Sequence, residues 1–199
     1  ISKYFKGNYY FGNLATKETF QKEAPDFGIL HLAMHGKTDK DNPLNSSLVF
    51  GNDLENHLYL YEIMNLDLNA NLTVLSACET GTGQVLKGEG VKSIARSFLQ
   101  AGSSSVVMSH WKVEDYASSN LMGHFYKNLA EGIRKDEALQ KAKLAYLQDA
   151  TGVQSHPFFW AGFVNFGNPE PLSGGDFPMW AWGIIGVLSL FLVWRLLKG

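Results

Sequence analysis

The chain has 199 residues, a formal net charge of −2 and a single cysteine. Its length suits one globular domain, since domains commonly have about 100–200 residues. One cysteine excludes an internal disulfide and a multi-thiolate zinc site, and the near-neutral charge lacks the basic footprint of a nucleic-acid-binding protein. Because 45% of the residues are hydrophobic, the chain is predicted to fold around a core.

Short apolar runs alternate with amphipathic segments along most of the chain. The runs are typical of buried strands and occupy 28–34, 72–76, 105–108 and 163–166. Helical patterns occupy 16–24, 62–66, 91–101, 115–129 and 136–149. Residues 48–50 and 58–61 flank a Gly-Asn-Asp turn and predict a hairpin. The alternation predicts an α/β fold whose parallel sheet is covered by helices on both faces.

Two reactive side chains follow the first two apolar runs. His35 comes directly after the first run, and Cys78 comes two residues after the second. In folds of this kind, catalytic residues gather at the carboxyl ends of strands. If the two strands are neighbours, their ends lie about 5–10 Å apart, within reach of a general base and a thiol nucleophile. The backbone N–H groups of Gly36 and Cys78 could then bind the oxyanion of a tetrahedral intermediate.

Each of these residues also has a purely structural interpretation. A free cysteine is often a small buried hydrophobe, but Glu79 and the polar, glycine-containing residues after it favour exposure of Cys78. His31 is flanked by apolar residues and is interpreted as a core histidine with satisfied hydrogen bonds. His110 ends the third apolar run and is either a wall of the site or a packing residue.

Acidic residues lie near several predicted strand ends. These residues are Asp39, Glu79, Glu114 and Asp115. They either favour a basic substrate side chain by charge complementarity or are solvated loop residues.

No metal or cofactor is predicted. The pair His31 and His35 lacks the glutamate of the H-E-x-x-H motif, and the glycine-rich residues 81–90 lack the Gly-Lys-Ser/Thr of a P-loop.

The C-terminal region predicts a membrane anchor. Residues 177–194 contain no charged side chain, and tryptophans stand near both ends of this span. A spanning helix needs about 20 mostly apolar residues, with aromatic side chains at the interfaces. We therefore expect one transmembrane helix at 177–197 that crosses the lipid bilayer once. A Pro- and Gly-rich linker at 169–176 precedes it. The alternative is a buried or interfacial helix. Arg195 and Lys198 would place this end in the cytoplasm, and the main domain outside it.

Two motifs make the sequence similar to a known family. The string LHLAMHG at 30–36 resembles the histidine motif of the CHAT domain family, whose members are relatives of caspases and separase. The string LSACETGTG at 75–83, followed by GEG at 88–90, resembles the cysteine motif of that family. The similarity runs from about 15 to 168.

The resemblance implies a caspase-like αβα sandwich with a mostly parallel sheet over residues 1–168, lacking its N-terminal part. It also implies a cysteine peptidase with a Cys–His dyad, in which His35 is the general base and Cys78 the nucleophile. Around them we expect Gly36, Glu79, His110 and Asp115 to bind the oxyanion or the peptide substrate; His110 stands where family members often have leucine. Family members often carry helical repeats upstream, so an upstream region or a partner would regulate the peptidase.

Other interpretations stay open. A non-catalytic module of the same fold would bind peptides or partners for signalling. Acyl transfer to or from a non-peptide substrate would use the same two residues. The side of the membrane is also open, because family analogy favours the cytoplasm whereas the charge rule places the domain outside.

Overall fold

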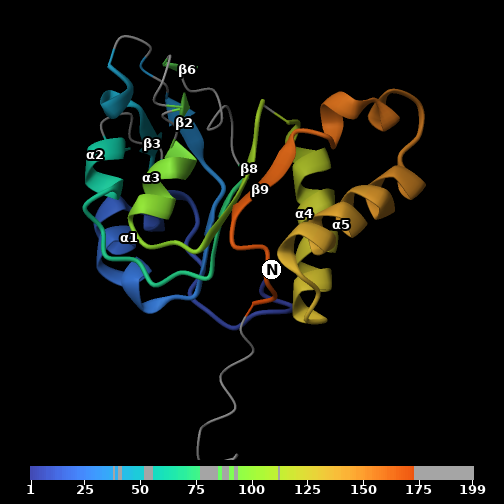
Figure 1. Cartoon of the computed structure of the whole chain (residues 1–199), viewed down its shortest axis with the longest axis horizontal. Coiled ribbons are helices and arrows are strands. Elements are labelled where there is room, and N and C mark those ends of the chain that lie inside the picture. Colours follow the sequence, from blue (N-terminus) through green and yellow to red (C-terminus); the bar gives the residue numbers. More distant parts are fainter. Residues whose placement is uncertain are drawn as a thin grey trace, which may run out of the picture.

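A four-stranded sheet forms the centre of the computed structural model, in the order β1-β5-β8-β9 (Figure 1). Strands β1 (Ile29–Leu32), β5 (Leu72–Leu75) and β8 (Ser105–Ser109) are parallel, and β9 (Phe163–Gly167) runs antiparallel to β8. Every residue of β5 and β8 is buried, as expected for strands that are covered on both faces. The mostly parallel sheet predicted from the apolar runs is therefore confirmed.

The structure describes 1–37, 39, 42–51, 56–76, 85–86, 90–91, 94–111 and 113–172. Cys78, Glu79 and the predicted transmembrane helix at 177–197 lie outside these residues. Among the residues that are described, no helix combines the length and the apolar character needed to cross a membrane.

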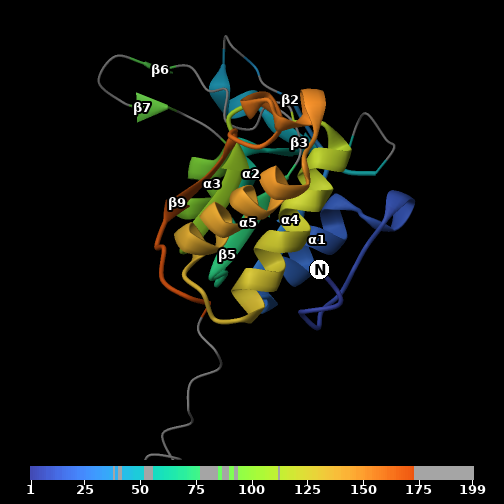
Figure 2. The same cartoon turned by 90° about the vertical axis from the view of Figure 1, so that its right-hand side faces the viewer.

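Helices cover both faces of the central sheet. In Figures 1 and 2, α4 and α5 lie on one face and α1, α2 and α3 on the other, which gives the three layers of an αβα sandwich. Their bounds are α1 Lys17–Glu23, α2 Leu60–Ile63, α3 Ile94–Gln100, α4 Asp115–Ala130 and α5 Lys135–Asp149. Successive side chains of one strand enter different cores: Leu75 packs with Phe98 of α3, whereas Val74 packs with Phe125 of α4.

The helix ends follow the sequence signals closely. The Thr16 hydroxyl accepts a hydrogen bond from the backbone N–H of Thr19 at 3.1 Å, so Thr16 caps α1. Gly102 follows α3 with φ +109°, a conformation that side chains rarely adopt. The predicted strand at 58–61 is shorter than expected, because Leu60 already opens α2 and the Glu62 carboxylate accepts a hydrogen bond from the Tyr59 N–H at 3.0 Å.

A small antiparallel sheet follows β1. It consists of β2 (His35–Lys37), β3 (Ser47–Val49) and β4 (His57–Tyr59), and its inner face is closed by Leu48 and Leu58, both fully buried. The β3–β4 hairpin confirms the prediction, whereas β2 was not predicted from its polar residues. The remaining elements are short; they are β6 (Val85–Leu86), β7 (Gly90–Val91) and the 3-10 helices Gly12–Leu14, Ala24–Asp26, Pro43–Asn45, Gly152–Ser155 and Pro157–Phe159.

Candidate functional site

The strands that precede His35 and Cys78 are neighbours in the central sheet. β1 pairs with β5 in parallel, with Leu32 opposite Leu75. The backbone N–H of Ser76 donates to the Leu32 carbonyl at 3.1 Å, which extends the pairing beyond β5. Both strands therefore end side by side at the same edge of the sheet, which meets the condition on which the predicted dyad depends. Since Cys78 lies outside the described residues, its distance from His35 stays a prediction.

His35 is exposed and opens β2 just beyond this edge. The next residue, Gly36, lies opposite Leu48 of β3. The Phe50 N–H donates to the Asn56 carbonyl at 2.9 Å, so these two residues form a hydrogen-bonded pair of β3 and β4. Hydrogen-bonded pairs recur at every second residue of an antiparallel ladder, so Leu48 and Leu58 form the next one. Leu48 therefore directs its backbone N–H and C=O toward β4 and away from β2. The Gly36 N–H consequently points away from β3, out of the ladder. That orientation suits the oxyanion role that the sequence predicts for Gly36.

A chain of hydrogen bonds links β1, α4 and the end of β5. The His31 ring lies between Tyr126 and Ser76, with Nδ1 at 2.8 Å from the Tyr126 hydroxyl and Nε2 at 3.0 Å from the Ser76 hydroxyl. Tyr126 is fully buried, and within the described residues His31 is the only partner of its hydroxyl. A buried O–H needs an acceptor, so Tyr126 donates to Nδ1. In the neutral ring Nε2 then carries the proton and donates to Ser76.

Burial keeps the His31 ring neutral. Desolvation lowers the pKa of His31 to about 4, and burial raises the pKa of Tyr126 above its ordinary value. A ring of such low basicity with both nitrogens engaged is poorly suited to act as a general base. His31 is therefore the satisfied core histidine that the sequence predicts. It fixes Ser76, two residues before Cys78 in the sequence.

His110 and Asp115 lie near the same edge but belong to different elements. His110 is exposed just beyond β8, its N–H donates to the Gly162 carbonyl at 3.0 Å, and its ring meets the Phe166 ring edge to face at 6.2 Å. Asp115 is exposed and is the first residue of α4. His110 thus packs against β9, and the substrate-binding role of both residues stays a prediction, as does that of Glu79, which lies outside the described residues.

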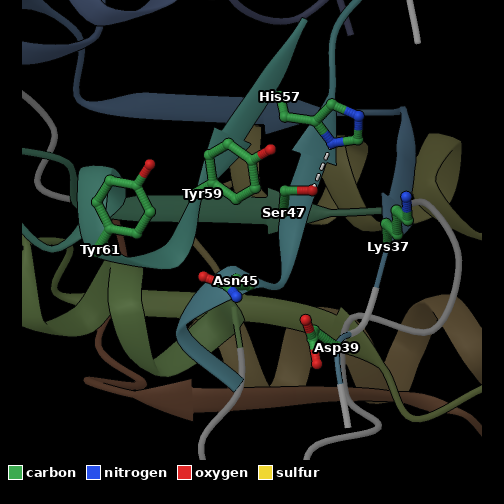
Figure 3. A pocket seen from close by; sticks show the side chains of 7 residues that line it. All are labelled: Lys37, Asp39, Asn45, Ser47, His57, Tyr59 and Tyr61. Carbon is green, nitrogen blue, oxygen red and sulfur yellow. Dashed lines mark hydrogen bonds between the residues drawn. The ribbon is translucent and has the colours of Figure 1, made fainter. Parts of the chain in front are cut away.

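A hollow of about 650 Å³ lies over the face of the small sheet that is opposite Leu48 and Leu58 (Figure 3). Its lining residues are Lys37, Asp39, Asn45, Ser47, His57, Tyr59 and Tyr61. This hollow was not predicted from the sequence, although aromatic side chains at alternate positions from 57 to 61 were a usable signal for one strand face. Within the described residues, no three His, Cys, Asp or Glu side chains gather to hold a metal ion.

The fold and the comparisons place the chain in the caspase-like class of mixed α/β proteins. The Saccharomyces cerevisiae separase, solved in complex with securin, superposes with a TM-score of 0.57. The alignment covers 77% of this chain and 9% of that chain, at 14% sequence identity. At this identity the similarity shows the shared fold.

The CHAT domain family model matches residues 2–168, and the chain belongs to this family. Two curated relatives are tetratricopeptide repeat protein 28 of Mus musculus and of Homo sapiens, which are 31% and 32% identical over 112 residues. These alignments cover 56% of this chain and only 4% of either relative. The chain thus matches a small part of much longer repeat proteins.

Proposed function

We propose that the chain is a membrane-anchored cysteine endopeptidase, with Cys78 as the nucleophile and His35 as the general base. The observation that carries the proposal is the parallel pairing of β1 with β5, since it brings the two strand ends to one edge of the sheet. Membership of the CHAT family and the caspase-like fold support the same assignment. The exposed His35 and the outward Gly36 N–H provide a base and an oxyanion donor on one short strand.

The reaction follows from these groups. His35 takes the thiol proton, and the Cys78 sulfur attacks the carbonyl carbon of the scissile peptide bond. The Gly36 N–H stabilises the negative oxygen of the tetrahedral intermediate. His35 then gives its proton to the leaving amine as the C–N bond breaks, which leaves a thioester. Water attacks the thioester with His35 accepting its proton, and the carboxylic acid product and the free thiol are released.

Cleavage of a peptide library tests the proposal. We expect the full chain to cut a subset of peptides, and Cys78→Ala or His35→Ala to lower the rate at least about 1,000-fold, because each removes an essential part of the dyad. His124→Ala on α4 is the matched control and should cut at the parental rate. Mass spectrometry of the products gives the rates. Equal cleavage by the parent and Cys78→Ala would rule out the peptidase assignment.

A non-catalytic partner-binding module is the second candidate. It is favoured by the curated relatives, whose names describe tetratricopeptide repeats and no enzymatic activity. Such a module would bind peptides without cutting them, and Cys78→Ala would bind them as tightly as the parent. The names of the same relatives support helical repeats as a regulatory partner of this domain, and we propose that the repeats lie upstream of it. Peptide binding measured beside cleavage therefore separates the two candidates.

A further inference from the structure

The hollow over the small sheet shares a sheet face with His35. In the antiparallel pairing His35 lies opposite Val49, and Lys37 lies opposite Ser47. Residues directly opposite each other point to the same face, and so do residues two apart along a strand. The other face is the one closed by Leu48 and Leu58, so His35 and Lys37 project together from the outer face.

Three aromatic rings form a row along this outer face. His57 and Tyr59 stack with ring centroids 5.6 Å apart at 19°, and Tyr59 and Tyr61 stack at 5.4 Å and 8° (Figure 3). The inner faces of the row are covered by neighbouring rings, so a cation cannot lie on them. Ring edges carry the positive end of the aromatic quadrupole. The edges of the row therefore suit an anion, and its inner faces are closed to a cation.

The charges around the hollow lead to the same preference. Within the described part of the chain, the exposed Lys37 ammonium has no hydrogen bond and no ion pair. Asp39, in contrast, accepts a hydrogen bond from the Asn42 N–H at 2.9 Å, while its own N–H donates to the Ser46 hydroxyl at 3.0 Å. Asp39 is thus engaged within its own loop, and Lys37 is the positive charge in the lining that a ligand carboxylate would meet.

We propose that this hollow binds an acidic side chain of the polypeptide substrate, with Lys37 as the ionic partner of the carboxylate. The proposal rests on the peptidase function proposed above and names its substrate class. Tyr59, Tyr61 and Asn45 line the same hollow, and their hydroxyl and amide groups are neutral hydrogen-bond donors. A carboxylate held by an ammonium and neutral donors makes charge-assisted hydrogen bonds, the stronger kind.

The spacing limits where the acidic residue sits in the substrate. Lys37 is two residues beyond His35, about 7 Å along an extended strand. We place the extended substrate alongside β2, where it has the same repeat, so its side chain in the hollow belongs two or three residues from the cleaved bond. The preference therefore concerns a fixed position near the cut.

A library in which Glu and Gln alternate at each position around the cleaved bond tests the proposal. We expect the parental chain to cut the Glu peptides about tenfold faster than the Gln peptides at one position, the effect of one charge-assisted contact. Lys37→Gln should abolish this ratio, and Lys37→Glu, which repels a carboxylate, should invert it in favour of the Gln peptides. Lys127→Gln, an exposed lysine on α4, is the matched control and should keep the ratio.

Binding of the same peptides to Cys78→Ala, with and without Lys37→Gln, gives a readout that needs no catalysis. Binding that prefers Glu and depends on Lys37 supports the site even if nothing is cut, and in that case only the peptidase function fails. Cleavage that depends on Cys78 but shows no Glu preference overturns the site and keeps the peptidase. If neither binding nor cleavage depends on Lys37, the acidic-side-chain site is wrong.

Discussion

His31 is neutral in the folded protein because its ring is enclosed between Tyr126 and Ser76. Desolvation lowers its pKa from 6.5 to about 4, so between these values the unfolded chain binds more protons than the folded one. Stability from this residue is fully present above pH 6.5 and is lost as the pH falls toward 4. The uptake of this proton by the unfolded chain lowers the unfolding free energy by about 2 kcal/mol when the pH falls from 7 to 5.

The variant His31→Gln should reduce this pH dependence. Glutamine cannot take up the proton, so the unfolding free energy of the variant should fall by about 2 kcal/mol less than that of the parent between pH 7 and pH 5. Urea unfolding at the two pH values measures the difference. His124→Gln on α4 controls for the exchange of a histidine for glutamine elsewhere in the chain. A parental pH dependence in His31→Gln would contradict a neutral, enclosed ring.

Single residues were predictable where their neighbours in the sequence set their surroundings. The apolar residues around His31 indicated a core position, which its hydrogen bonds to Tyr126 and Ser76 confirm. The hollow could not be predicted in this way. Lys37, Ser47 and Tyr59 come from three strands and become neighbours only through pairing across a polar loop. No local pattern encodes that pairing.

At the scale of elements, the end of α3 depends on one glycine. Gly102 has φ +109°, and a Cβ there would lie 2.1 Å from the Leu68 carbonyl oxygen. The conformation costs a non-glycine residue about 1–2 kcal/mol, and the overlap is with rigid backbone. Leu68 is itself tied to this turn, since its N–H donates to the Ala101 carbonyl at 2.7 Å. The helix and the segment before β5 are therefore held together at this point.

Gly102→Ala should lower the unfolding free energy by more than about 3 kcal/mol, because strain and overlap add. Gly132→Ala is the matched control: Gly132 has φ +77°, but a Cβ there would meet no atom within 4 Å, so the substitution should cost only about 1 kcal/mol. Gly123→Ala, within α4 and also in open space, should be neutral or stabilising. Chemical denaturation measures all three. A similar loss for Gly102→Ala and Gly132→Ala would show that the overlap is relieved.

Most elements were predictable because their apolar periodicity matches the burial that they have in the fold. The exceptions have physical reasons. β2 is polar and exposed on its outer face, so its residues His35–Lys37 carry no apolar alternation. β4 ends early because Glu62 caps the turn into α2 at Tyr59. In both cases an interaction with a neighbouring segment, rather than propensity, decides where the element lies.

At the scale of the whole molecule, the helices that the structure describes lie on the two faces of the central sheet, and the candidate site lies at the carboxyl ends of β1 and β5. α4 and α5 pack on one face and α1 to α3 on the other (Figure 1). Among the described residues, the small sheet follows β1 beyond its carboxyl end. The alternation of apolar runs and helices was sufficient to predict these layers. The position of the small sheet at this edge was not predictable, since it depends on the polar connection after β1.

The membrane anchor that we propose belongs to this scale, since it would hold the whole domain at a lipid surface. Residues 177–194 lack charge, and one charged side chain at the centre of such a span costs about 2.5–3.5 kcal/mol on insertion scales. The full chain should therefore stay in the membrane pellet after carbonate extraction, and a chain ending at Asp176 should be released. Leu188→Arg should be partly released, whereas Leu188→Ile should stay in the pellet. Release of the full chain by carbonate would rule out the anchor. If the full chain resists extraction, protease accessibility in intact cells reports the side of the membrane on which the domain lies.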